Sequence, residues 1–138
     1  MTRREIRDNA FKLVFEQLLR DDDIGVLYEI AEEVDEITVN DEVKKLVEGT
    51  LKYRDELDEI ISKYSKSRNI SRISKLNIAI LRIALYEAIY EENTPMNAAI
   101  SEAIKLSMVY TYQEDTSFIN GVLGAFSRDF NKGEEADA

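Results

Sequence analysis

The stretch that decides the fold is SFINGVLGAF, residues 117–126. Its Asn120-Gly121 pair, set between apolar residues, is the usual signal for a tight β-hairpin turn. The flanks contradict a hairpin, because Phe118 and Val122 recur at helical spacing and do not alternate as in a strand. The stretch therefore predicts a helix. Glycine inside a helix costs about 1 kcal/mol relative to alanine, so we expect another helix or a ligand to approach the backbone closely at Gly121.

Helical periods of apolar residues continue through most of the 138 residues, and the chain has a single proline and five glycines. These features predict an all-α protein of about six helices. The expected helices cover residues 3–19, residues 24–35, residues 38–64 with a cap at Thr38 or Asn40, residues 76–90, a segment capped by Asn97, and a last segment capped by Asp115 or Thr116 that frays at residues 131–133. A short helical turn is expected at Ile70 and Ile73. Residues 1–132 would form one domain, followed by a disordered acidic tail, residues 133–138.

Residues 76–90 are apolar almost all round, which predicts a buried helix. Asn77, Arg82 and Glu87 interrupt the segment, so it is not a membrane span, and these polar groups need partners inside the fold. The chain also contains no stretch of 18 apolar residues, so we expect no contact with a membrane.

The net charge of −10 is unevenly distributed along the chain. Residues 1–20 carry five basic and three acidic groups, and residues 61–90 carry six basic and one acidic group. Residues 21–60, by contrast, carry fifteen acidic and four basic groups. A local basic patch can attract phosphate despite acidic flanks. The alternative is that the acidic faces provide solubility and the basic residues pair with them.

Several chemical classes are excluded by composition. The chain has no cysteine and no histidine, so disulfides, thiol chemistry, the commonest general base and the commonest zinc ligand are all absent. No phosphate-binding loop, dinucleotide fingerprint or nucleophile elbow occurs. The acidic run over residues 32–36 is typical of a solvated face and not of a metal site. We therefore expect no catalytic residue, no metal, no cofactor and no small-molecule substrate.

Three sequence blocks, in this order, resemble the NusB family of bacterial transcription antitermination factors. The first is RREIRDNAFKLVFEQL, residues 3–18, with clustered arginines before a helix that contains an aromatic residue. The second is AILRIALYEAIYEENTP, residues 79–95, which is similar to the family's Leu-Arg-x-Ala-x-Tyr-Glu helix. The third is AAISEAIKLSMVY, residues 98–110, followed by SFINGVLGAF, which is similar to the family's Phe-Val-Asn-Gly-Val-Leu ending.

The resemblance implies an all-α fold of about seven helices in two packed helical subdomains. It also implies a cytoplasmic, non-enzymatic protein that binds boxA RNA of ribosomal leader transcripts. In the family this binding takes place together with the ribosomal protein NusE, within the antitermination complex on RNA polymerase.

The resemblance also suggests which residues contact RNA. Arg3, Arg4 and Arg7 match the family's arginines, and guanidinium groups bind phosphate in a bidentate manner and stack on bases. Phe15 and Phe118 match family aromatics and would stack single-stranded bases if exposed. For both rings, packing in the core is the alternative.

NusE is expected to dock around residues 77–91, and the residues chosen as its contacts are Asn77, Arg82, Tyr86 and Glu87. The second hypothesis is a helical adaptor of the same fold without RNA binding, whose acidic residues 21–59 would contact a basic protein.

Overall fold

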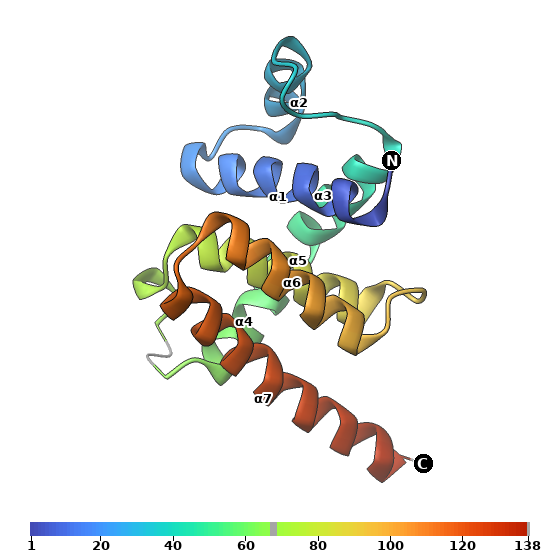
Figure 1. Ribbon diagram of the computed structural model, residues 1–138, viewed down its shortest axis with the longest axis vertical. Helices are drawn as coiled ribbons and strands as arrows, with labels where there is room; N and C mark the ends of the chain where they lie inside the picture. The colour runs from blue at the N-terminus through green and yellow to red at the C-terminus, as the bar shows by residue number, and fades with distance from the viewer. Residues whose placement is uncertain (67–68, 138) are drawn as a thin grey trace.

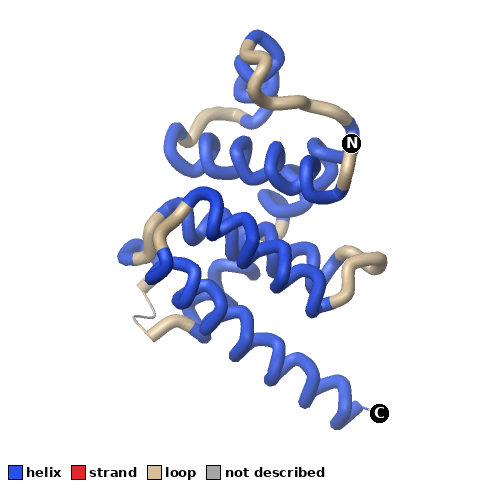
Figure 2. Tube along the Cα trace, viewed as in Figure 1, coloured by secondary structure: helices blue, strands red, loops and turns tan. Residues whose placement is uncertain are grey.

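The computed structural model describes the backbone of residues 1–66 and 69–137, and the side chains of this part up to Phe130. Over these residues the chain forms seven α-helices, one short 3-10 helix and no strand (Figures 1 and 2). The elements are α1 (Arg3–Arg20), α2 (Ile24–Glu33), α3 (Asp41–Lys52), α4 (Arg54–Tyr64), η1 (Ile70–Arg72), α5 (Lys75–Tyr90), α6 (Met96–Tyr110) and α7 (Gln113–Asp137). The all-α prediction is confirmed.

The helices form two groups that meet at α5. In the first group α1 contacts α2 and α3; in the second, α4, α5, α6 and α7 pack on one another. Figure 1 shows the first group above the second. Helix α5 also contacts α1 and α3, so it belongs to the core of both groups. This arrangement agrees with the two packed subdomains expected from the resemblance.

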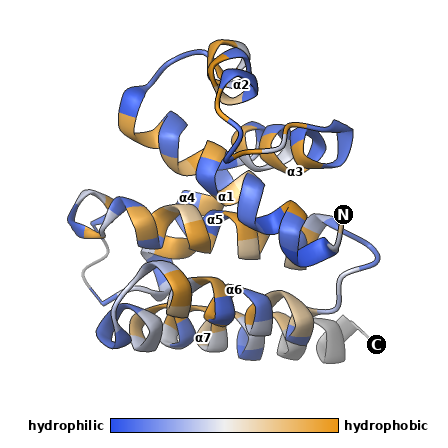
Figure 3. Ribbon diagram, turned by 45° about the horizontal axis from the view of Figure 1, so that its top comes forward, coloured by the Kyte–Doolittle hydropathy of each residue, from blue (hydrophilic) through white to orange (hydrophobic). Residues whose placement is uncertain are grey.

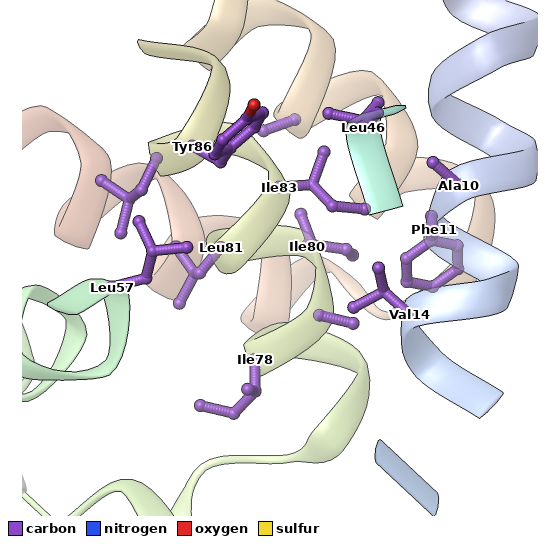
Figure 4. Packing of buried hydrophobic residues seen from close by; sticks show 14 of the residues in the cluster. Ala10, Phe11, Val14, Leu46, Leu57, Ile78, Ile80, Leu81, Ile83 and Tyr86 are labelled. Carbon is purple, nitrogen blue, oxygen red and sulfur yellow. The ribbon is translucent and has the colours of Figure 1, made fainter. Parts of the chain in front are cut away.

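Helix α5 is the centre of the core, as its all-round apolar sequence predicts. Every residue from Asn77 to Glu87 is buried. In Figure 4, Ile80 and Ile83 of α5 lie toward Phe11 and Val14 of α1. Figure 3 shows hydrophobic residues concentrated around α5 and hydrophilic residues toward the outside. Burial of this kind contributes about 25 cal/mol for each Å² of apolar surface, so α5 is the element on which the fold depends most.

The prediction of one helix over residues 38–64 is wrong, because the segment contains two helices. Asn40 caps α3 as expected, accepting a hydrogen bond from the backbone N–H of Val43 at 2.9 Å. The break comes at Tyr53, whose φ of −99° and ψ of 16° are not helical. Its ring stacks on Tyr90 at the end of α5, with 4.0 Å between the ring centroids. Asp55 lies in the first turn of α4, where negative charge is favourable.

The predicted caps of the last two helices are also wrong. Pro95, and not Asn97, occupies the position before α6. Helix α7 begins at Gln113, before Asp115, and the Asp115 carboxylate accepts a hydrogen bond from the backbone N–H of Tyr112 at 3.2 Å. The carboxylate thus reaches back to the helix start, as in a capping box. At its other end α7 continues to Asp137, beyond the predicted fraying at residues 131–133.

Close packing against a glycine occurs at Gly49 and not at Gly121. A Cβ added at Gly121 would have no heavy atom within 4 Å, apart from its own helix and neighbours, so no other helix approaches there. A Cβ added at Gly49 would overlap the phenol ring of Tyr86. Gly49 therefore allows α3 to approach α5.

Alanine substitutions at the two glycines should consequently change stability in opposite directions. Gly49→Ala should lower the free energy of unfolding by about 1–3 kcal/mol, because the methyl group overpacks the contact with Tyr86. Gly121→Ala should raise it by about 0.4–1 kcal/mol, because alanine favours the helix and has room. Urea denaturation of both variants measures the difference, and equal effects at the two positions would contradict the packing described here.

Candidate nucleic-acid interface

A capping box positions the arginines at the start of α1. The Thr2 hydroxyl accepts a hydrogen bond from the backbone N–H of Glu5 at 3.1 Å, and the Thr2 backbone N–H donates to the Glu5 carboxylate at 3.4 Å. The box fixes the first turn. Arg3 and Arg7 lie one turn apart on α1, and both contact α5.

The contact with α5 is made through Glu87, whose side chain is only 1% exposed. Arg7 donates from Nε to Glu87 Oε1 at 2.7 Å, and Arg3 donates from Nη2 to Oε2 at 3.3 Å. The Arg7 side chain is 11% exposed and that of Arg3 is 50% exposed. A buried carboxylate is tolerated only when it is paired. Arg7 thus acts as an internal counter-ion, whereas half of Arg3 remains accessible.

Arg4 pairs with Glu102 of α6, a carboxylate that also lies 4.0 Å from Nη1 of Arg7. Its Nε and Nη2 each donate to a Glu102 oxygen at 3.3 Å, while the Arg4 side chain stays 66% exposed. The hydrogen bonds from Arg4 lower the pKa of Glu102. Partial burial of the carboxylate acts in the opposite direction, but its effect is smaller. This bidentate geometry is also the one in which a guanidinium binds phosphate.

The lowered pKa of Glu102 makes its contribution to stability depend on pH. Ionised Glu102 stabilises the fold above its ordinary pKa of 4.5, and the contribution is lost as the pH falls through the lowered folded value. Glu102→Gln should therefore be less stable than the unmodified protein at pH 7, and the difference should disappear on acidification. Urea denaturation at pH 7, 5 and 3 measures it. A difference of the same size at every pH would show that the charge of Glu102 is not responsible.

One hollow opens beside Arg4 and Glu102, and a second opens between α5 and α7. The α1–α6 hollow, about 560 Å³, is lined by charged residues that include Arg4, Lys12 and Lys105, together with Val109. The α5–α7 hollow, about 850 Å³, is lined by Phe118 and Gly121 of α7, by the cations Lys66 and Arg72, and by the carboxylates Glu114 and Asp115. Aromatic and basic side chains around an open hollow are suited to bases and phosphates of a single strand.

The two predicted aromatic residues lie differently. Phe15 is half-buried against the core and stacks on Phe11, with ring centroids 6.0 Å apart and 13° between the planes. Phe11 also contacts Tyr110 of α6, at 4.8 Å between centroids. Phe118 is half-buried as well, but it lines the open α5–α7 hollow. Each ring thus packs on the core and keeps an accessible part, and stacking of RNA bases on either ring stays a prediction.

The four residues predicted to contact the partner are all buried within the fold. Their exposed fractions are 4% for Asn77, 5% for Arg82, 8% for Tyr86 and 1% for Glu87. Asn77 donates to Asp115 Oδ1 at 2.9 Å, and Arg82 donates two hydrogen bonds of 2.8 Å to the Asp58 carboxylate. Asn77 and Arg82 thus each have a carboxylate partner, although Asn77 Oδ1 and Arg82 Nη1 are buried without a hydrogen bond.

Several residues of the two hollows were not predicted from the sequence. Lys66 and Arg72 fall in the basic middle segment, so the charge distribution was the signal that could have indicated them. Glu102 and Lys105 offered no such signal. Their position opposite Arg4 depends on how α6 packs beside α1, which local sequence does not record.

The part of the chain that the structure describes contains neither a candidate metal site nor a candidate membrane span. Among its residues no group of three or more acidic side chains is arranged to hold a metal ion. None of its helices is both long and apolar enough to cross a membrane.

Comparison with known proteins identifies the chain. The model of the NusB family matches residues 4–128. The chain belongs to the NusB family. Its NusB relatives include the transcription antitermination protein NusB of Bacillus subtilis, 36% identical over 132 residues, which cover 96% of this chain and 99% of the relative. NusB of Acetivibrio thermocellus is 37% identical over 126 residues, which cover 90% of this chain and 87% of the relative.

Solved NusB structures have the same fold. A structure of the antitermination factors NusB and NusE in complex with double-stranded RNA contains a chain that is 27% identical to this one, with a TM-score of 0.80. The alignment covers 92% of this chain and 96% of the other. The relation to the NusB family therefore extends over almost the whole molecule.

Proposed function

We propose that this protein is a transcription antitermination factor that binds boxA RNA together with the ribosomal protein NusE and joins the antitermination complex on RNA polymerase. The family match over residues 4–128 carries this proposal. The likeness to the chain bound with NusE and RNA supports it. On this proposal the protein works in the cytoplasm and has no catalytic step of its own.

The residues proposed for RNA binding are Arg3, Arg4, Arg7, Phe15 and Phe118. Some of them would contact the RNA, and others would hold the contacting residues in place. The exposed guanidinium groups of Arg3 and Arg4 are available to phosphate, and Phe118 is available to a base at the α5–α7 hollow. Arg7 is mostly buried on Glu87, so its contribution is to hold α1 against α5. Phosphate would compete with Glu102 for Arg4, because both bind the same face of a guanidinium.

NusE is proposed to dock over α5 and the segment that follows it. The burial of Asn77, Arg82, Tyr86 and Glu87 supports a role in shaping this surface more than a role in direct contact. Tyr90, at the end of α5, is 36% exposed and stacked on Tyr53, and an aromatic residue in this position is typical of protein interfaces.

A titration of labelled boxA RNA tests the function. The full chain should bind the RNA at 50 mM salt, with or without NusE, and more tightly with NusE. The logarithm of the affinity should fall linearly with the logarithm of the salt concentration, because bound phosphates release counterions. A scrambled RNA of the same length is the control. Absence of binding under both conditions, or affinity equal to that for the scrambled RNA, would contradict the proposal.

The alternative of an adaptor without RNA binding has one observation in its favour. Val26, Ile30 and Val34 are exposed within the acidic segment around α2, which suits a basic, partly apolar protein. On this alternative the chain would bind such a partner while showing no salt-dependent affinity for RNA. The same titration therefore distinguishes the two functions.

A further inference from the structure

Tyr112 is the most exposed of the large hydrophobic side chains that the structure describes, with 81% of its surface accessible. It lies in the short connection between α6 and α7. Two further apolar side chains close by in the chain are also exposed, Met108 at 69% and Val109 at 72%, and several exposed apolar side chains in one place are typical of a binding surface. The exposure of Tyr112 is not explained by the packing of the described residues.

The backbone that carries Tyr112 is held on both sides. The Thr111 N–H donates to Ser107 O at 2.8 Å, the Tyr112 N–H donates to Asp115 Oδ2, and the Thr116 N–H donates to Tyr112 O at 3.1 Å. Beneath the connection, the hydroxyl of Ser107 bonds to those of Thr111 and Thr116 at 2.8 and 2.6 Å. The connection therefore presents the ring from a fixed position, and this lowers the entropy cost of binding to it.

The connection also joins the two hollows of the candidate interface. Val109, three residues before Tyr112, lines the α1–α6 hollow with Arg4 and Lys12. Asp115, three residues after it, lines the α5–α7 hollow with Phe118. Each hollow holds cations beside an equal number of carboxylates, so a strand can place its phosphates at the cations while one of its bases stacks on the ring. An apolar protein segment would instead have to bury all of these charges.

We propose that Tyr112 is a stacking platform for one base of the bound RNA, at the point where the strand passes from the α1–α6 hollow to the α5–α7 hollow. The inference rests on the proposed RNA-binding function. Stacking on a ring is tolerant of sequence and contributes little charge. Tyr112 would thus contribute to affinity but not to the dependence of affinity on salt.

Two substitutions test the affinity part. Tyr112→Ala should weaken binding of the labelled boxA RNA about tenfold, within the range known for loss of one stacked base. Tyr112→Phe keeps the ring and should bind as the unmodified protein does. The slope of affinity against salt should be the same in all three proteins. Because the side chain is exposed, helicity and urea denaturation should be unchanged, which excludes a folding defect.

A tryptophan at the same position tests stacking directly. The chain has no tryptophan, so Tyr112→Trp carries a single indole whose fluorescence should be quenched when RNA is added. Val34→Trp is the matched control, since Val34 is exposed at 45% but lines neither hollow, and its emission should not change.

The outcomes separate the inference from the function on which it rests. RNA binding that is unaffected by Tyr112→Ala, with unchanged emission from Tyr112→Trp, overturns the inference and leaves the proposed function intact. Absence of RNA binding by the unmodified protein overturns both. Emission from Tyr112→Trp that responds to NusE alone, and not to RNA, overturns the inference in favour of a protein contact.

Discussion

Replacing Glu87 with alanine should lower the free energy of unfolding by about 3–5 kcal/mol, because it removes the close carboxylate partner of the mostly buried Arg7 and leaves only Glu102, at 4.0 Å. The Arg7 side chain is 11% exposed and donates to Glu87 at 2.7 Å. A loss of this size is a large share of the 5–15 kcal/mol that stabilises a typical domain. Urea denaturation monitored by circular dichroism measures it.

The matched control is Glu102→Ala, which removes the same type of side chain from the neighbouring helix. Its main partner, Arg4, is mostly exposed to water and loses little when the carboxylate is removed. The effect on stability should therefore be much smaller. Replacing Arg7 and Glu87 together by leucine should recover much of the stability lost in Glu87→Ala. If the double variant is less stable than the single one, the buried pair is not the cause.

Reversing the charges of Arg3 and Arg4 to glutamate should reduce affinity for boxA RNA at least a hundredfold at low salt. Two phosphate contacts are lost, and two negative charges repel the strand. Both side chains are half or more exposed, so a glutamate at either position can turn to solvent, away from Glu87 and Glu102, and the helical content should be retained. Fluorescence anisotropy of the labelled RNA measures the loss, and the salt dependence should become less steep because fewer counterions are released.

The control for this double variant is the reversal of Lys45 and Arg54, which changes the net charge equally but lies outside both hollows. It should bind nearly as tightly as the unmodified protein. Equal losses in the two double variants would mean that only the net charge matters. Arg7 is excluded from the reversal because Arg7→Glu would place a carboxylate against buried Glu87 and unfold the protein instead of testing RNA binding.

The parts of the fold that the sequence predicted are those with a local signal. The all-round apolar pattern over residues 76–90 indicated the buried α5, the asparagine at position 40 indicated the start of α3, and Ile70 indicated the 3-10 turn. Each signal depends on residues a few positions apart, so it is independent of how the helices pack.

The features that the sequence did not reveal depend on residues far apart in the chain. The break at Tyr53 is accompanied by stacking on Tyr90, and the requirement for Gly49 arises from Tyr86. The helix around Gly121 was predicted correctly, but the same lack of long-range information led to the wrong expectation of a second helix close to it. The other expectation, that a ligand approaches Gly121, stays a prediction.

The candidate site also has a part that could be predicted from the sequence and a part that required the structure. The resemblance indicated that the arginines of α1 matter, but the structure was needed to distinguish buried Arg7 from exposed Arg4 and to place Glu102 beside it. The sequence block that resembles the family, residues 79–95, contains Arg82, Tyr86 and Glu87, and Asn77 lies two residues before it. All four residues nevertheless lie inside the fold. The roles of all these residues in binding stay predictions until the variants are measured.

The position of the first residue has a practical consequence for preparing the protein. Met1 lines the α1–α6 hollow beside Arg4, and its sulfur accepts a hydrogen bond from the Asn40 side chain. An affinity tag fused ahead of Met1 would thus be tethered at the mouth of the hollow, where its charges would compete with RNA. The last turn of α7 points away from the other helices (Figure 1). Purification handles and surface-immobilisation linkers therefore belong at that end of the chain.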